Sequence, residues 1–160
     1  MCSLILLRHA KSSWEDLTLR DFDRSLNSKG CNDAKKIGKR LLDRDIIPDV
    51  IVSSSSIRTK QTIEILKSVI GKDIITHFTS NLYHANPNVI MRHFLDFYSP
   101  NLSVMIVGHN PGIQLLFENL SGIDIPNYPT CSFSFFRYNQ EKKFVLLNFE
   151  SPKKNIFITN

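Results

Sequence analysis

The chain has 160 residues, of which 42% are hydrophobic and 22% are charged, and its formal net charge is +5. These values predict one soluble globular domain over residues 1–160 and exclude a disordered sequence. The positive charge favours an anionic partner, but the lysines and arginines are scattered in pairs and form no nucleic-acid-binding module, so we expect no nucleic acid.

The cysteines and the N-terminal segment indicate the cellular compartment. Cys2, Cys31 and Cys131 are odd in number and far apart, which suits unpaired thiols in a reducing cytoplasm. No Cys/His pair has zinc-ligand spacing, so we expect neither a metal nor a cofactor. The apolar opening is too short for a membrane span and lacks the basic start of a signal peptide. We therefore expect a cytoplasmic protein that does not bind membranes.

The first predicted elements are a strand over 3–8 and a helix over about 29–44, with Ser28 as its N-cap. The inner face of that helix is expected to contain Ala34, Ile37, Leu41 and Leu42. The next strand covers 48–54, and the helix over 58–70 follows it.

From residue 73 onward, strands and helices are again expected to alternate, until two strands without a helix between them end the pattern. The expected elements are a strand over 73–78, a helix from Pro87 to about Tyr98, a strand over 103–109, a helix from Pro111 to before Gly122, and an antiparallel hairpin of 131–138 and 143–150. Alternating strands and helices predict an α/β fold with three αβα layers: a mainly parallel sheet with helices on both faces, plus the C-terminal hairpin.

Basic and imidazole side chains follow three of the predicted strands. Arg8 and His9 end the first strand, Arg58 opens the helix after the second, and His109 ends the strand over 103–109. Each residue alone has an ordinary explanation, as a surface charge or a core histidine. Ligands of such sheets bind beyond the carboxyl ends of the strands, where these four groups would meet.

The chemistry of this cluster points to a phosphate ligand. Two guanidinium groups repel each other unless an anion lies between them, and the guanidinium fork matches phosphate oxygens. Helix N-termini beside Arg58 and His109 would add backbone donors. A neutral imidazole at a rigid strand end is also a competent nucleophile toward phosphorus, which explains His9.

The same residues resemble a known family. "LRHAKS", "VSSSSIRTKQT" and "VGHNPG" are similar to the motifs of the histidine phosphatase superfamily, with Ala10 in place of the usual glycine. "DFDRSLNSKG" (21–30) resembles a further family segment, with Ser25 where proline is usual, and "NLYHA" (81–85) fits between them. The resemblance is strongest to the SixA-like phosphohistidine phosphatases and implies a phosphoglycerate-mutase-like fold.

The resemblance also implies roles for individual residues. His9 would be the nucleophile, Arg8 and Arg58 would bind the phosphoryl group, and His109 would stabilise the transition state. Arg24 would reach the phosphate or the substrate, and Ser12 and Ser13 would add minor contacts. The implied partner is a phosphoprotein carrying phosphohistidine, or else a small phosphorylated substrate.

The carboxylic acid that larger members use to protonate the leaving group is missing from its usual places. Residues 74–95 contain no Asp or Glu, and Asn110 follows the second histidine. This absence favours phosphohistidine, whose P–N bond is already labile, over stable phosphate esters. Other candidate acids remain in the N-terminal loop: Glu15, Asp16, Asp21 and Asp23.

Two alternatives remain open. A broad phosphomonoester phosphatase of the same fold would need one of those loop carboxylates as its acid. A non-catalytic phosphoprotein-binding module would need only the arginines, which the His9/His109 pair disfavours.

Overall fold

The computed structural model describes residues 2–139, 141, 143–153 and 155–158. Over these residues the chain forms one seven-stranded sheet in the order β3-β2-β4-β1-β5-β6-β7. The strands are β1 (Cys2–Arg8), β2 (Val50–Ser54), β3 (Ile75–Thr79), β4 (Ser103–Gly108), β5 (Phe133–Tyr138), β6 (Phe144–Glu150) and β7 (Asn155–Ile158). Strands β3, β2, β4 and β1 are parallel, whereas β5, β6 and β7 continue the sheet in antiparallel pairs.

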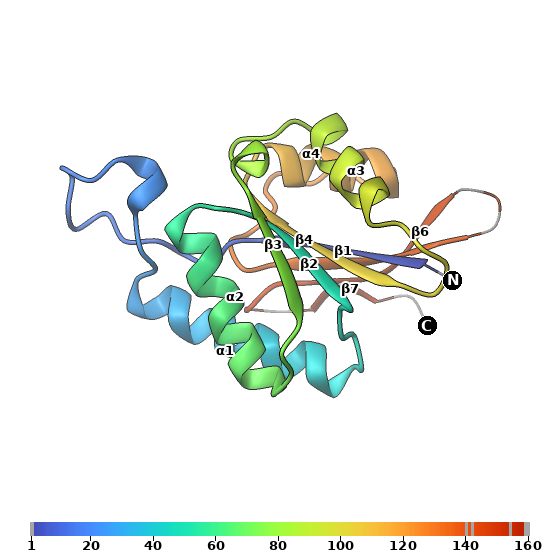
Figure 1. Cartoon of the computed structure of the whole chain (residues 1–160), viewed down its shortest axis with the longest axis horizontal. Coiled ribbons are helices and arrows are strands. Elements are labelled where there is room, and N and C mark those ends of the chain that lie inside the picture. The colour runs from blue at the N-terminus through green and yellow to red at the C-terminus, as the bar shows by residue number, and fades with distance from the viewer. Residues whose placement is uncertain (1, 140, 142, 154, 159–160) are drawn as a thin grey trace.

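Helices cover both faces of this sheet, as the alternating pattern predicts. Helices α1 (Ser28–Asp43) and α2 (Ile57–Ile70) pack on one face, and α3 (Pro87–Asp96) and α4 (Gly112–Ser121) lie on the other (Figure 1). Leu4 to Leu7 of β1 are completely buried, because each face of that strand meets a helical layer. The predicted three-layer α/β fold with its C-terminal hairpin is confirmed. In the described part of the chain, no helix is both long and apolar enough to cross a membrane.

Two local predictions were wrong, and one strand was not predicted. Asn27, not Ser28, caps α1, since its side chain accepts a hydrogen bond from the backbone N–H of Gly30. Leu42 is 44% exposed, because Ala34, Ile37 and Leu41 already fill the stripe that faces the sheet. A further strand lies after the hairpin, where the sequence pattern predicts no element: residues 155–158 pair with β6 as the seventh strand.

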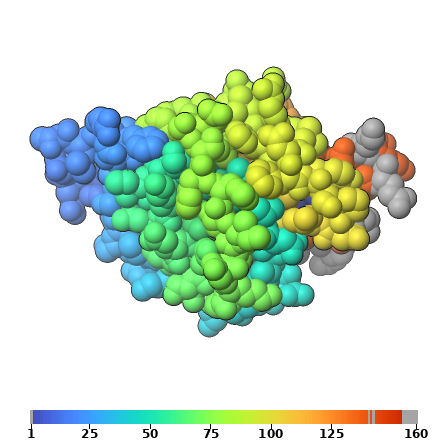
Figure 2. All heavy atoms as spheres, viewed as in Figure 1, coloured from blue at the N-terminus to red at the C-terminus, as the bar shows by residue number. Residues whose placement is uncertain are grey.

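The segment between β1 and α1 forms a loop that is closed at its base. Ser12 and Leu26 form an antiparallel bridge, and the backbone N–H of Ser13 donates to the carbonyl of Ser25. Gly30 lies so close to the backbone of Lys11 that any Cβ there would overlap the Lys11 carbonyl oxygen. From this closed base, the loop projects from the body of the molecule at the carboxyl ends of the parallel strands (Figures 1 and 2).

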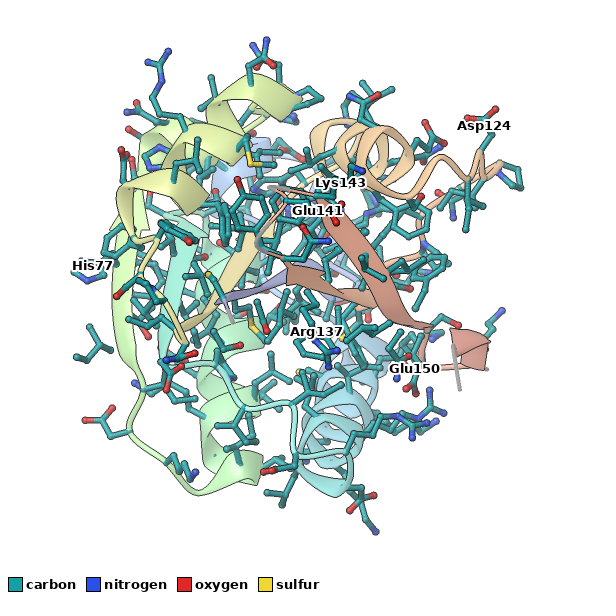
Figure 3. The ribbon with its side chains drawn as sticks, turned by 90° about the vertical axis from the view of Figure 1, so that its right-hand side faces the viewer. His77, Asp124, Arg137, Glu141, Lys143 and Glu150 are labelled. Atoms are coloured by element: carbon teal, nitrogen blue, oxygen red, sulfur yellow. The ribbon has the colours of Figure 1, made fainter. Side chains whose placement is uncertain are left out.

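A buried ion pair fixes the antiparallel part of the sheet to α1. Glu150 lies at the end of β6 (Figure 3) and is fully buried. Its carboxylate pairs with Arg44, and Nη1 of Arg40 is 3.7 Å away. Because an unpaired carboxylate would be costly at this depth, the end of β6 stays over α1. This contact places residues 151–153 at the same end of the sheet as the carboxyl end of β1.

Candidate active site

One cavity of about 770 Å³ lies at the carboxyl ends of the parallel strands. The structure brings all five residues singled out by the sequence into its wall, from three strand ends and the projecting loop. They are Arg8, His9, Arg24, Arg58 and His109. Side chains from distant parts of the sequence therefore line the same cavity.

His9 directs an unprotonated ring nitrogen toward Arg58. Its Nδ1 lies 2.7 Å from the carbonyl oxygen of Ala10, so Nδ1 carries the proton and donates it. The Nε2 atom accepts a hydrogen bond from Nε of Arg58 at 3.3 Å. Burial lowers the pKa of His9 to about 3, and the charges of Arg58 and Arg8 act in the same direction against the bond to Ala10. The imidazole is neutral at physiological pH.

His109 faces His9 with a ring-centroid separation of 4.9 Å. Its Nε2 donates to the hydroxyl of Ser54 at 2.9 Å, and its Nδ1 accepts from Nη2 of Arg58 at 3.3 Å. Burial lowers the pKa of His109 to about 2, assisted by His9 and Arg58. Arg58 can only donate, so it fixes the proton of His109 on Nε2, and the hydroxyl of Ser54 at the end of β2 accepts that proton. The sequence did not distinguish Ser54 from the other serines of the run 53–56.

Asp21 supplies the negative charge that this cluster needs. Its carboxylate lies 2.8 Å from Nη2 of Arg58 and accepts a hydrogen bond of 2.6 Å from the hydroxyl of Tyr83. Partial burial would raise the pKa of Asp21, but the hydrogen bonds from Tyr83, Arg58 and Arg24 together hold it well below its usual range. Asp21 therefore gives the guanidinium of Arg58 an anionic partner within the chain.

Arg24 uses its guanidinium to hold the projecting loop. Its Nε donates to the carbonyl of Ser13 and its Nη2 to the hydroxyl of Ser12, both at 2.8 Å, while Nη1 donates to Asp21 at 2.9 Å. The guanidinium carbon also lies 3.2 Å from the ring centroid of Trp14. All three nitrogens are thus engaged within the loop and with Asp21.

The segment before β5 positions Arg8. The sequence analysis assigned no role to this segment. Its Nη1 donates to the carbonyl of Tyr128 at 2.6 Å, and Tyr128 in turn donates its buried hydroxyl to the carbonyl of Leu6. Burial lowers the pKa of Arg8, with Arg58 acting in the same direction. Among the described residues, Nε of Arg8 is buried without a hydrogen-bond partner, so its N–H is available to a ligand.

Only one of the four candidate acids lines the cavity. Asp21 does, but it is ionised and so holds no proton to donate. Asp23 pairs with Arg20 at 2.7 Å, and Asp16 accepts from Thr18. The sequence reasoning overlooked His84, which lines the cavity with its Nε2 3.6 Å from Asp21. Within the part of the chain that the structure describes, no group of three or more His, Cys, Asp or Glu could hold a metal ion.

Comparison with known proteins decides the family. Residues 4–79 match the model of the histidine phosphatase superfamily, branch 1. A protein of Agrobacterium tumefaciens assigned as the phosphohistidine phosphatase SixA is 30% identical, with a TM-score of 0.83 over 94% of this chain and 97% of that chain. The chain belongs to the histidine phosphatase superfamily.

Within the superfamily it falls in the SixA-like branch. A SixA protein from Nakamurella multipartitia shares the fold, with a TM-score of 0.77 at 22% identity over 95% of this chain and 96% of that chain. A chloroplastic protein of Arabidopsis thaliana is 36% identical over 138 residues, which are 81% of this chain. The chain spans 63% of the length of that relative.

The neutral histidines of this SixA-like protein predict how its stability depends on pH. The unfolded imidazoles titrate near pH 6.5, whereas the folded pKa values of His9 and His109 are about 3 and about 2. Between these values the unfolded state binds more protons, so acidification destabilises the fold, by up to about 1.4 kcal/mol per pH unit for each imidazole. Urea unfolding at pH 7 and pH 5 measures the loss, which we expect to be smaller in His9→Ala. An equal loss in both proteins would contradict this prediction.

Proposed function

We propose that this protein is a metal-independent phosphatase that removes phosphate from phosphohistidine on a protein, through a phosphohistidine intermediate at His9. The observation that carries the proposal is the state of His9: its Nδ1 is protonated and bonded to Ala10, and its Nε2 lone pair lies beside Arg58 in the cavity. An unprotonated nitrogen among cations suits attack on an anionic phosphoryl group.

In the first step Nε2 of His9 attacks phosphorus while the P–N bond of the substrate breaks, and the electron pair of that bond stays on the departing ring. The other ring nitrogen of the substrate carries a proton, so the ring leaves as neutral imidazole. Arg8 and Arg58 hold the phosphoryl oxygens as charge builds up on them. The negative charge of the bound group favours protonation of His109, whose Nδ1 then donates to an oxygen. In the second step water attacks the phosphorylated His9, which releases inorganic phosphate and restores the neutral imidazole.

The choice of substrate follows from the ionised state of Asp21. A serine or sugar alkoxide needs a proton to leave, and acid catalysis of that step is typically worth about 10²–10⁴-fold. Asp21 is held as a carboxylate by Tyr83, Arg58 and Arg24 and offers no proton. An imidazole leaving group depends less on such help, so phosphohistidine suits this cavity better than a phosphate ester.

We expect the wild type to hydrolyse a phosphohistidine protein with a kcat/KM at least about 10²-fold above that for a phosphoserine peptide. Phosphate release from both, and from p-nitrophenyl phosphate, measures the ratio. The same assay with a chelator should give unchanged rates.

Equal rates on the two substrates would instead indicate a broad phosphomonoester phosphatase. Activity that a chelator abolishes and a divalent ion restores would contradict metal independence. Binding of phosphoprotein without turnover would favour the non-catalytic module.

A further inference from the structure

The cavity is much larger than one phosphoryl group needs. Its volume of about 770 Å³ falls in the range of sites that enclose whole drug-sized ligands. Beyond the histidines and arginines, the wall continues through residues that the mechanism does not use. These are Lys11, Lys29, Asp33, Asn127, Pro129, Thr130, Ser151, Pro152 and Lys153.

The sheet order shows where this second part of the cavity lies. β5 neighbours β1 and β6 neighbours β5, with Phe133 paired to both Leu7 and Glu150. The residues after β6 therefore lie level with His9, at the same end of the strands, and two strands away from it. Since neighbouring strands are about 4.8 Å apart, the far part of the cavity is roughly 10 Å from the end of β1.

Basic side chains line the cavity from the end of β1 to this far part. Lys11 follows β1, Lys29 is in the first turn of α1, and Lys153 follows β6. The only acidic side chain that lines it among the described residues, Asp33, is 4% exposed and pairs with Lys29. Lys11 and Lys153 have exposed side chains, so their two charges remain for a ligand. We call Lys11, Lys29 and Lys153 the basic arm.

The mouth of the cavity also has apolar side chains that suit a polypeptide. Trp14, which lines the cavity, is 67% exposed, and Leu17 on the same projecting loop is 82% exposed. Figure 2 shows this loop standing out from the body of the molecule. Exposed large apolar groups beside a charged cavity are typical of a surface that contacts another protein.

We propose that the basic arm binds a second anionic group of the substrate, roughly 10 Å from the phosphoryl group, as the two strand spacings between β1 and β6 require. The group is an acidic side chain of the polypeptide that carries the phosphohistidine. The proposal rests on the proposed function and adds the substrate class to it. A second phosphate on a small molecule offers the same charge, and the experiment separates the two.

The first measurement needs no catalysis. Calorimetry gives Kd for two alkyl phosphonates of equal length, one ending in a carboxylate about 10 Å from the phosphonate and one ending in a neutral amide. We expect the carboxylate form to bind about tenfold more tightly to the wild type, and the difference to vanish in Lys11→Glu/Lys153→Glu. Lys29 is left intact because it neutralises the buried Asp33. The matched control Lys72→Glu, an exposed lysine after α2, should keep the difference.

The second measurement identifies the source of the anion. It compares kcat/KM for phosphohistidine peptides with acidic or neutral flanking residues, and for a small bisphosphate of the same span. Preference for the acidic peptide, lost in the double variant, supports the proposal. Preference for the bisphosphate, or an equal Kd for the two phosphonates, overturns it. Tighter binding of the carboxylate form without turnover of any peptide would instead refute the proposed function alone.

Discussion

His9→Ala is expected to lower phosphate release from a phosphohistidine protein by at least about 10³-fold, because it removes the nitrogen that we propose to form the covalent intermediate. The acid-labile phosphoryl label that the wild type acquires during turnover should be absent from the variant. Rapid quenching followed by protein-bound phosphate analysis measures both effects.

His77→Ala is the matched control for this experiment. His77 is an exposed residue of β3, and its side chain points away from the sheet (Figure 3). Full activity is expected in this variant. A His9→Ala protein that keeps more than about a tenth of the wild-type rate would show that the nucleophile is another group, since nucleophile removal typically costs far more.

Arg58→Ala should lower kcat/KM by about 10²–10³-fold, with effects on both kcat and KM. This one guanidinium contacts His9, His109 and Asp21, so its loss removes the positioning of both imidazoles together with the phosphoryl binding that we propose for Arg58. Steady-state kinetics with a phosphohistidine substrate measure the change.

Arg58→Lys should recover only a small part of that loss, because an ammonium group keeps the charge but not the fork of donors. Arg137→Ala, an exposed arginine of β5 (Figure 3), provides the control and should behave as wild type. A change in kcat/KM of less than about threefold in Arg58→Ala would contradict the proposed role of Arg58, since loss of even one preorganised donor usually costs more than that.

The fold was predictable wherever the hydrophobic pattern is long and regular. Leu4 to Leu7 form a continuous apolar run and lie in a fully covered strand. The cap of α1 was not predictable, because Asn27 and Ser28 are adjacent and are equally good caps, so only the backbone geometry selects Asn27. β7 was missed because four residues are too short to give a clear pattern next to a basic segment.

The arginines and histidines of the candidate site were predictable from the sequence. The groups that hold these side chains in place were not. Arg8, His9, Arg58 and His109 follow strand ends, where the topology brings side chains together. Asp21 looked no different in the sequence from Glu15, Asp16 or Asp23, because its position depends on how the closed loop folds back. Tyr128 holds Arg8 through its backbone carbonyl, and its hydroxyl donates to the carbonyl of Leu6. A contact made by a backbone carbonyl cannot be predicted from the residue type.

The pairing of Asp21 with Arg58 has a consequence for the catalytic cycle. Under the proposed mechanism, a phosphoryl group that reaches Arg58 would exchange with a carboxylate of the same chain, so we expect it to gain less binding free energy than it would from unpaired cations. The same exchange would help product release, since the carboxylate would return to Arg58 as inorganic phosphate leaves. We therefore expect Asp21 to lower the affinity for the product and to restore the ion pair of Arg58 before the next turnover.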